Sequence, residues 1–463
     1  MQGASRREGV RLLVRLQFVH THARAWFTAM VTRPGRRRTG IVVGVAIAIG
    51  STLLIGAIAT SDGTRDPHAP IITSAWRDVV TPGQPMKPFI VTDTGYPVPT
   101  LQASGLPPGV HFTDNGNRSG IIVGIPESAA AGSYLVMIVA TNQAGTARQA
   151  FELTVMNVKS RRTLLLVAGQ SNAVGFQSYA TDPMTGVDYF APPYSNGADV
   201  SSTISWMPSS KVAPAGGGGA TGQVPLDTPQ LLSDARGGRV RIFGPEIGWA
   251  RQIYSDTGQG VSVVKAAFAG TNLAVGWNPK TPGGIYSRMI AKVISTMSAD
   301  ARAGQLDTIG GVAWAQGERD ALRPALAAEY TSNLKAFIAA LRSDLPMAPT
   351  TPIVLVKESL EESIALNERN GKCDATRVCA VFATGDAEVR AADDWAATHL
   401  PNVLVVDTLG RPRVADLAIH LTNTSELAVG RDIGIAIRRA QHRRAGGAVA
   451  AVPGDETATV RRG

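Results

Sequence analysis

The distribution of apolar and polar positions divides the chain of 463 residues into three parts with different periodicity. Residues 39–60 contain no charged residue and consist mostly of Ile, Val, Ala, Gly and Leu. Residues 70–157 show short β-type runs separated by turns of Gly, Pro and Asn, whereas residues 160–442 alternate strand-like and helix-like runs. The pattern predicts a long apolar segment followed by an all-β domain and an α/β domain.

The alternation within 160–442 favours a parallel sheet covered on both faces. The strand candidates are 164–168, 260–267, 309–315, 353–357 and 402–407. An amphipathic helix is predicted over 324–344, since Pro324 stands in its first turn and its apolar positions recur at spacings of three and four. These positions are Leu326, Tyr330, Leu334, Phe337 and Leu341. Residues 176–242 do not fit the alternation, and we interpret them either as an insertion near a functional site or as a disordered surface excursion.

The β-type runs of 70–157 have the length of a single β-sandwich. One strand face would hold Tyr134, Val136, Ile138 and Ala140, and another Phe151, Leu153 and Val155. The stretches 105–112, 120–126 and 132–145 resemble the Ig-like, cadherin-like modules of bacterial surface proteins. Such modules are spacers or ligand binders, and the residues here mark no ligand site.

The net charge of +9 is concentrated at the amino terminus, where residues 1–38 hold nine Arg against one Glu. The rest of the chain is nearly neutral and has no basic stripe, so no nucleic-acid partner is expected. About 20 apolar residues span a bilayer, and 39–60 reaches that length. Arginines precede this segment and Asp62 and Asp66 follow it, which places the amino terminus in the cytoplasm.

Two interpretations of 39–60 remain open. It is either a single-pass anchor in the cytoplasmic membrane or a signal segment cleaved after Ala59, because Ala57-Ile-Ala59 is a small-x-small site and Arg37-Arg38 suggests twin-arginine export. Both place the domains that follow outside the membrane. The predicted organisation is a basic cytoplasmic arm (1–38), an anchor or signal segment (39–60), a linker (61–69), an Ig-like sandwich (70–157), an α/β domain (160–442) and a disordered tail (443–463).

Metal and cofactor chemistry is not expected. The only two cysteines, Cys373 and Cys379, lie in one loop and would form a disulfide outside the membrane. They lack the neighbouring histidine needed for a metal site. The chain also contains no His-x-His or His-Glu-x-x-His pattern.

The chemically informative stretch is 164–175, an apolar run of buried-strand length that breaks at Gly169 into a polar turn. Ser171 lies on that turn, where its hydroxyl would stand clear of the sheet edge and its N–H could face a bound carbonyl. An acyl-transfer nucleophile needs this placement together with a base and oxyanion donors. Taken alone, the stretch favours a solvated turn that happens to contain a serine, because small polar residues are common in turns.

Several stretches in order resemble the SGNH-hydrolase superfamily, in the form of the sialate O-acetylesterase and acetylxylan-esterase-like families. They are 164–175, 243–251, 265–272, 312–320 and 420–430, and the resemblance covers roughly 160–442. It implies a three-layer α/β sandwich with a flavodoxin-like parallel sheet. It also implies that Gly270 belongs to the oxyanion hole and that the block at 420–430 carries the base.

The candidate catalytic residues are Ser171, His420, Asp416 and Glu318. Of the seven histidines only His399, His420 and His442 lie in the α/β domain, and His420 alone follows the last strand on a loop. The candidate oxyanion donors are the N–H groups of Ser171 and Gly270 and the side-chain amide of Gln316. The family usually places an Asp three residues before the base, whereas Asp416 stands four before His420. The orienting acid is therefore either Asp416 or Glu318.

The sequence thus predicts an extracytoplasmic serine esterase that removes O-acetyl groups from carbohydrate, either a sialate or a polysaccharide. The expected partners are an acetylated glycan and, through 39–60, the cytoplasmic membrane. The alternative is a non-catalytic surface adhesin or scaffold that uses the Ig-like module.

Overall fold

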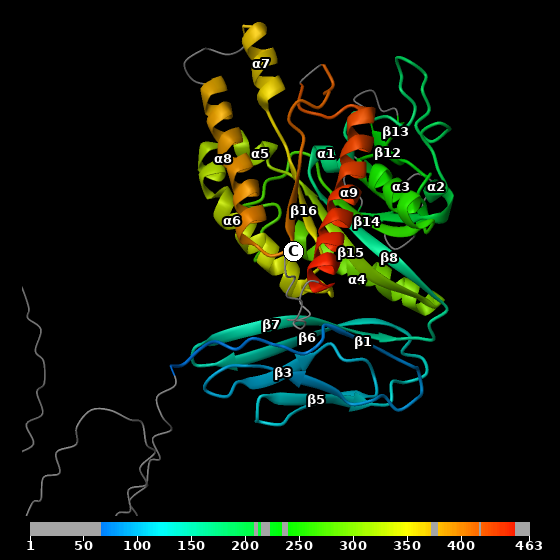
Figure 1. Ribbon diagram of the computed structural model, residues 1–463, viewed down its shortest axis with the longest axis vertical. Helices are drawn as coiled ribbons and strands as arrows, with labels where there is room; N and C mark the ends of the chain where they lie inside the picture. Colours follow the sequence, from blue (N-terminus) through cyan, green and yellow to red (C-terminus); the bar gives the residue numbers. More distant parts are fainter. Residues whose placement is uncertain are drawn as a thin grey trace, which may run out of the picture. The chain divides into compact units, whose positions relative to one another are not determined.

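The computed structural model describes residues 66–207, 212–213, 223–233, 239–371, 378–415 and 418–449 (Figure 1). The predictions for the basic arm and for 39–60 fall outside these ranges, as do those for Asp416 and Cys373. Within the ranges given, no helix has both the length and the apolar character needed to cross a bilayer. Cys379 is in a disulfide bond, as predicted.

The amino-terminal described domain is an all-β sandwich, as predicted. Its strands are β1 (Arg77–Val80), β2 (Phe89–Thr92), β3 (Thr100–Ser104), β4 (Val110–Asp114), β5 (Ser119–Gly124), β6 (Gly132–Asn142) and β7 (Gly145–Val155). They form two sheets with the orders β1-β7-β6-β3 and β2-β5-β4. The two predicted strand faces on β6 and β7 contribute to one buried core, in which Val136, Ile138, Phe151 and Leu153 are fully buried.

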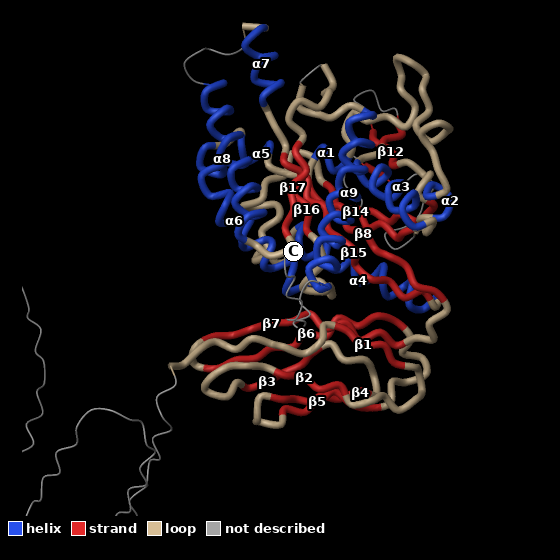
Figure 2. The backbone as a smooth tube through the Cα atoms, in the orientation of Figure 1, coloured by secondary structure: helices blue, strands red, loops and turns tan. Residues whose placement is uncertain are grey.

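The second domain is built on a seven-stranded sheet, seen as red strands in Figure 2. In spatial order the strands are β11 (Val224–Pro225), β9 (Thr203–Trp206), β14 (Val261–Ala267), β8 (Ser160–Gly169), β15 (Gln305–Ala315), β16 (Ile353–Lys357) and β17 (Val403–Asp407). Every pairing is parallel except that of β11 with β9. All five predicted strands are present. Their pairing explains why they are apolar runs, because a parallel sheet is buried on both faces.

Helices cover both faces of this sheet (Figure 1). One face packs against α4 (Ile285–Ala303), α6 (Pro324–Asp344) and α8 (Val378–His399), and the other against α3 (Pro245–Thr257) and α9 (Asn423–Val449). Leu164 and Leu166 of β8 join the first core and Leu165 and Val167 the second, since successive side chains of a strand point to opposite faces. The predicted three-layer arrangement follows from these two cores.

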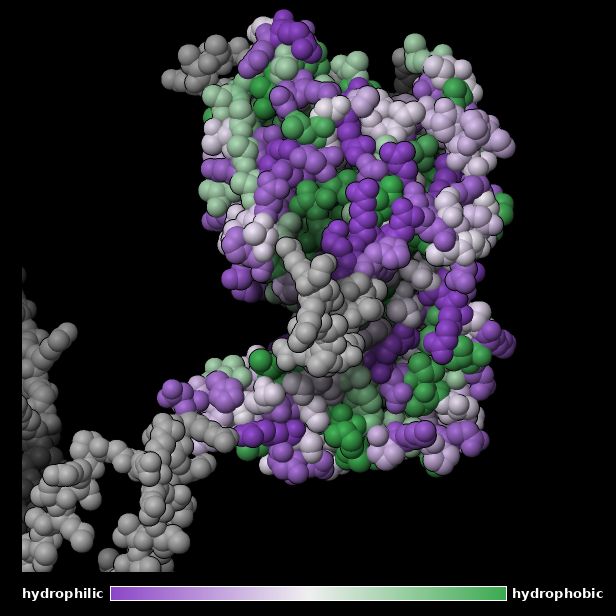
Figure 3. All heavy atoms as spheres, viewed as in Figure 1, coloured by the Kyte–Doolittle hydropathy of each residue, from purple (hydrophilic) through white to green (hydrophobic). Residues whose placement is uncertain are grey.

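Helix α6 has the bounds predicted from its apolar spacing. Tyr330, Leu334, Phe337 and Leu341 are buried on its inner face, as expected. Hydrophilic side chains occupy most of the face of the domain drawn in Figure 3, with smaller hydrophobic groups between them. The apolar stripe of the helix is therefore core packing.

Two predictions are wrong in this domain. Residues 203–206 lie within the region interpreted as an insertion, yet they form β9, a strand of the main sheet paired with β14. The rest of that region holds α2 (Ala198–Ser201), and a separate sheet of β10 (Val212–Ala213), β12 (Gln230–Ser233) and β13 (Arg239–Ile242). The tail was expected to start at 443, but α9 continues to Val449, because its Arg and Ala residues favour helix.

The order of the parallel strands determines where a site forms. Without β9, which is also parallel and pairs with β14, the strands β14-β8-β15-β16-β17 read second, first, third, fourth and fifth in chain order, as in a flavodoxin-like sheet. The order reverses between β8 and β15, and ligands of open α/β sheets bind outside the carboxyl ends of the strands at such a point. Ser171 follows β8 and Glu318 follows β15, so both lie at this edge.

Candidate active site

The turn that carries Ser171 is fixed by close contact between strands. Gly169 ends β8 with φ +145°, and a Cβ at this position would lie 2.0 Å from the carbonyl oxygen of Ala315 on β15. Only glycine permits this approach. The chain then turns at Gln170, and Ser171 begins the short helix α1 (Ser171–Val174). Its N–H stands in the first turn of a helix, where backbone donors have no intrahelical acceptor.

A cavity of about 240 Å³ brings together four of the predicted residues, Ser171, Gly270, Glu318 and His420. They come from the ends of β8, β14 and β15 and from the loop after β17. The other lining residues are Gln170, Phe176, Ala269, Arg319, Leu322 and Ile419. Gln316 is not part of this lining. The sheet edge therefore assembles a candidate nucleophile, base and oxyanion glycine around one cavity.

His420 is the histidine of this cavity, as predicted by elimination. His399 stacks on Trp395 with ring centroids 4.9 Å apart, and His442 lines a different cavity. The Nδ1 atom of His420 lies 2.6 Å from Oε1 of Gln177, and its ring lies 4.9 Å from that of Phe176. An amide oxygen only accepts hydrogen bonds, so the neutral ring carries its proton on Nδ1. Nε2 is then the acceptor available to a serine hydroxyl.

The side chain of Asn172 connects the nucleophile turn to the segment that carries His420. Its Nδ2 donates to Oε1 of Glu318 at 3.1 Å and to Oε2 of Glu358 at 3.0 Å. Its Oδ1 accepts from the N–H of Leu421 at 3.1 Å. Asn172 is only 1% exposed. The sequence pattern predicted no role for Asn172 or Glu358, although Asn172 directly follows the candidate nucleophile.

Glu318 and Glu358 form a buried pair of carboxyl groups. Burial, and then the charge of Glu358, raises the pKa of Glu318 to about 8. Burial also raises the pKa of Glu358, but Arg413, whose Nη2 lies 3.5 Å from Oε2 of Glu358, opposes this rise. We therefore assign the negative charge at neutral pH to Glu358, paired with Arg413, and the proton to Glu318.

The geometry gives Glu318 a structural partner other than the base. Its Oε1 accepts from Asn172, and its Oε2 is buried without a hydrogen-bond partner in the described part of the chain. No hydrogen bond joins this carboxyl group to His420 within the same part. The interpretation of Glu318 as the acid that orients His420 receives no support from these contacts, and Asp416 lies outside the described residues.

Gly270, the predicted oxyanion glycine, lines the cavity. Its φ of +71° lies in the left-handed region that favours glycine, and the space where a Cβ would stand is open. The loop that follows is fixed by Asp320, whose carboxylate accepts from the N–H of Leu273 at 3.2 and 3.1 Å. A buried carboxylate thus holds the loop that follows Gly270.

Gln316 is buried and does not line the cavity. Its Nε2 donates to Oε1 of Gln170 at 3.2 Å, to the carbonyl of Thr271 at 3.2 Å and to Oδ2 of Asp320 at 2.6 Å. Tyr330 donates to its Oε1 at 3.1 Å, which fixes the orientation of the amide. Because protein acceptors engage both hydrogens, this conformation does not match the predicted oxyanion role of Gln316. The residue instead supports the loop that carries Gly270.

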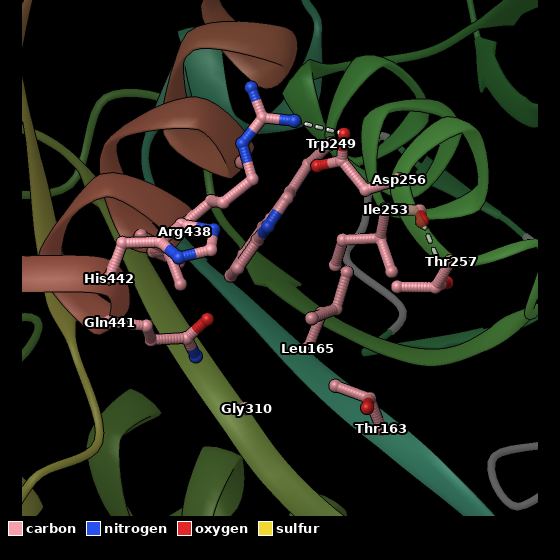
Figure 4. Close-up of a pocket in the computed structure, with 12 residues that line it drawn as sticks. Thr163, Leu165, Trp249, Ile253, Asp256, Thr257, Gly310, Arg438, Gln441 and His442 are labelled. Atoms are coloured by element: carbon pink, nitrogen blue, oxygen red, sulfur yellow. Dashed lines mark hydrogen bonds and ion pairs between the residues drawn. The ribbon is translucent and has the colours of Figure 1, made fainter. Parts of the chain in front are cut away.

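A second cavity of about 360 Å³ lies between α3 and α9 (Figure 4). Trp249, Ile253 and Ile437 line it with apolar atoms, and an ion pair between Arg438 and Asp256 bridges the two helices. Its lining includes His442 but neither serine nor cysteine, and it shares no residue with the first cavity. The candidate chemistry therefore belongs to the cavity of Ser171.

The parallel sheet, with a serine and a histidine facing one cavity at its carboxyl edge, defines the class of α/β esterases. The particular family follows from comparison. The carbohydrate esterase family described as sialic acid-specific acetylesterase matches residues 161–438, more than half of the chain, and the chain belongs to it. It is thus a hydrolase of acetyl esters that acts on carbohydrates. An Ig-domain family, He_PIG, matches residues 69–156.

Solved structures with similarity include a protein of Arabidopsis thaliana, 21% identical over 60% of this chain and 98% of that one, with a TM-score of 0.39. A carbohydrate acetylesterase from Xanthomonas citri is 15% identical over 81% of this chain and 76% of its own, with a TM-score of 0.38. The titin M4 domain is 23% identical over 20% of this chain and 100% of that domain, with a TM-score of 0.17. None of the curated proteins matches the chain.

Proposed function

We propose that this protein is an extracytoplasmic serine esterase that removes O-acetyl groups from a sialate or a polysaccharide by a Ser-His-acid mechanism. The observation that carries the proposal is the shared cavity of Ser171, His420 and Gly270 at the switch point of the sheet. The hydrogen bond at Nδ1 of His420 supports it, since Nε2 is then the basic nitrogen.

In the proposed reaction Nε2 of His420 accepts the proton of Ser171 Oγ as this oxygen attacks the acetyl carbonyl. The N–H groups of Ser171 and Gly270 donate to the oxyanion that forms. When the tetrahedral intermediate collapses, the bond to the sugar oxygen breaks and His420 returns the proton to it. Water then attacks the acetyl-serine with the same base, which releases acetate and restores the Ser171 hydroxyl.

The acid of the proposed mechanism is Asp416. A carboxylate near the base stabilises the imidazolium that forms when His420 takes the proton. Asp416 precedes His420 by four residues, one more than the spacing that is usual in the family. Glu318, neutral and bonded to Asn172, would maintain the position of the turn instead.

The location of the protein is a separate proposal that rests on the sequence alone. The segment 39–60 and the arginines before it favour an anchor, with the amino terminus in the cytoplasm and residues 61–463 outside. In this arrangement the Ig-like module is a spacer between the membrane and the esterase domain.

The test uses Ser171→Ala in the full-length protein. We expect hydrolysis of p-nitrophenyl acetate, and acetate release from acetylated glycans, to fall by about three to six orders of magnitude with the fold intact. A variant that keeps more than about a tenth of the wild-type rate would contradict the assignment of the nucleophile. A wild-type protein that hydrolyses neither substrate would favour the adhesin alternative. A panel of acetylated sialates, xylans and cell-wall glycans identifies the carbohydrate.

A further inference from the structure

Gln177 has a backbone conformation that is unusual for its residue type. Its φ is +69°, in the left-handed region where a residue with a Cβ is disfavoured. Such conformations cluster at functional sites, where the surrounding structure imposes them. In this conformation the side chain of Gln177 brings Oε1 within 2.6 Å of Nδ1 of His420. The strain and the contact therefore occur at the same residue.

The contact determines what the imidazole of His420 can do. The distance of 2.6 Å is at the short limit for a hydrogen bond between nitrogen and oxygen. Since the amide oxygen can only accept, the bond selects the tautomer with the proton on Nδ1. It also persists, and strengthens, when the ring becomes positively charged, because charged donors form stronger hydrogen bonds.

Two further contacts near the ring come from the same short segment. Phe176 packs against the imidazole, with the ring planes at 49°, and Asn172 holds the backbone of Leu421. Neither contact determines which ring nitrogen carries the proton, whereas the hydrogen bond from Nδ1–H to Oε1 of Gln177 does. Of the charged residues described, Glu318 and Arg319 of α5 (Glu318–Ala321) line the same cavity as His420, and Asn172 links Glu318 to the Glu358–Arg413 pair.

We propose that Gln177 is a positioning residue for the base, which holds His420 in the Nδ1–H tautomer so that Nε2 faces Ser171. The proposal rests on the proposed function only in taking His420 as the base. The mechanism already assigns an acid to the base. Gln177 would be a second, neutral acceptor, which comes from the segment 171–177 that carries the nucleophile. The proposal does not depend on which residue is the acid.

The first measurement does not depend on activity. In the full-length protein labelled with ¹⁵N-histidine, the signals of His420 are identified by their loss in His420→Ala. We expect the wild-type ring to be protonated on Nδ1 when neutral, and Gln177→Ala to shift the tautomer toward Nε2–H. Gln177→Gly serves as a second variant, because glycine removes the backbone strain as well as the side chain. The control is Gln441→Ala, in the other cavity (Figure 4).

The second measurement is kinetic. Gln177→Ala and Gln177→Gly should each lower kcat about 10- to 100-fold with little change in KM, the range for one hydrogen bond to a charged group. Gln177→Glu places a carboxylate at Nδ1, so the pKa of His420 should rise. The acid limb of the profile of kcat/KM against pH should then move up by about one unit or more.

The outcomes separate this inference from the proposed function. Unchanged tautomer and kcat in both Gln177 variants, with Ser171→Ala inactive, would overturn the role of Gln177 and leave the esterase mechanism standing. Loss of activity in both variants, with an unchanged tautomer and no shift of the acid limb in Gln177→Glu, would also overturn it. If Ser171→Ala were active, the proposed mechanism would be rejected. The tautomer measurement would still show whether Gln177 holds His420 in the Nδ1–H tautomer.

Discussion

The buried carboxyl group of Glu318 should make the stability of the esterase domain depend on pH, and Glu318→Gln should remove that dependence. Glu318 is 3% exposed, and its pKa is raised to about 8, first by burial and then by the charge of Glu358. Glutamine has the same shape, keeps an oxygen that accepts from Asn172, and does not ionise. The difference in stability between wild type and Glu318→Gln thus measures the free-energy cost of ionising the buried carboxyl group.

The sign follows from comparing the two states. The unfolded carboxyl group loses its proton near its ordinary pKa of 4.5, while the native group keeps its proton up to about 8. Its contribution to stability is therefore complete below pH 4.5 and is lost as the pH rises toward 8. Each pH unit in that window corresponds to about 1.4 kcal/mol, so the native state loses about 3 kcal/mol by pH 7 and about 5 kcal/mol by pH 9.

The assay is chemical denaturation of wild type and Glu318→Gln at several pH values between about 5 and 9. The free energy of unfolding of the variant, relative to wild type, should rise by about 1.4 kcal/mol per pH unit and level off above pH 8. Glu368→Gln, at an exposed position of α7 (Glu361–Arg369), is the matched control and should show a flat difference. A flat difference for Glu318→Gln would refute the assignment of the proton to Glu318.

Three further predictions concern the site and the topology. His420→Ala should lower kcat by about three to six orders of magnitude. His399→Ala should leave kcat unchanged, because the ring of His399 stacks on Trp395. An equal loss in both variants would reject His420 as the specific base. Asp416→Asn should lower kcat by several orders of magnitude with little change in KM, and Glu318→Gln should lower kcat far less. A larger loss of kcat in Glu318→Gln than in Asp416→Asn would make Glu318 the orienting acid. A carboxyl-terminal reporter should be active only if it functions outside the cytoplasm, and mass spectrometry would exclude the anchor if the mature chain began at Thr60.

The parts of the fold that the sequence predicts are those in which local pattern and burial coincide. The run 164–168 is apolar at every position because β8 is buried on both faces, and the spacing of Tyr330, Leu334 and Phe337 matches one helix face. Ser171, Gly270 and His420 meet because the carboxyl ends of parallel strands share one edge. Each of these inferences follows from the periodicity of apolar residues or from the rule that the carboxyl ends of parallel strands share one edge of the sheet.

The parts that sequence reasoning missed depend on contacts between distant residues. The strand Thr203–Trp206 is short and lies among Gly-rich and Pro-rich segments, and its pairing with β14 stabilises it. Gln170 and Gln316 both follow strands at the same edge, and their spacing does not reveal which amide faces the cavity. The partners of Asn172 are Glu318 on α5, Glu358 after β16 and Leu421 in the loop after β17. Because they are distant in the sequence, no local pattern predicts them.

These contacts connect the base to the segment that also carries the nucleophile. Ser171 begins the segment, Asn172 holds the backbone of Leu421, and Phe176 and Gln177 contact the ring of His420. The loop after β17 supplies the histidine, but the segment 171–177 determines where its ring lies. A change in that loop which preserves the Leu421 N–H, the ring and the carboxylate of Asp416 should therefore be tolerated better than a change within 171–177. This asymmetry explains how the spacing between Asp416 and His420 can differ from the family pattern while Ser171 and His420 still line one cavity.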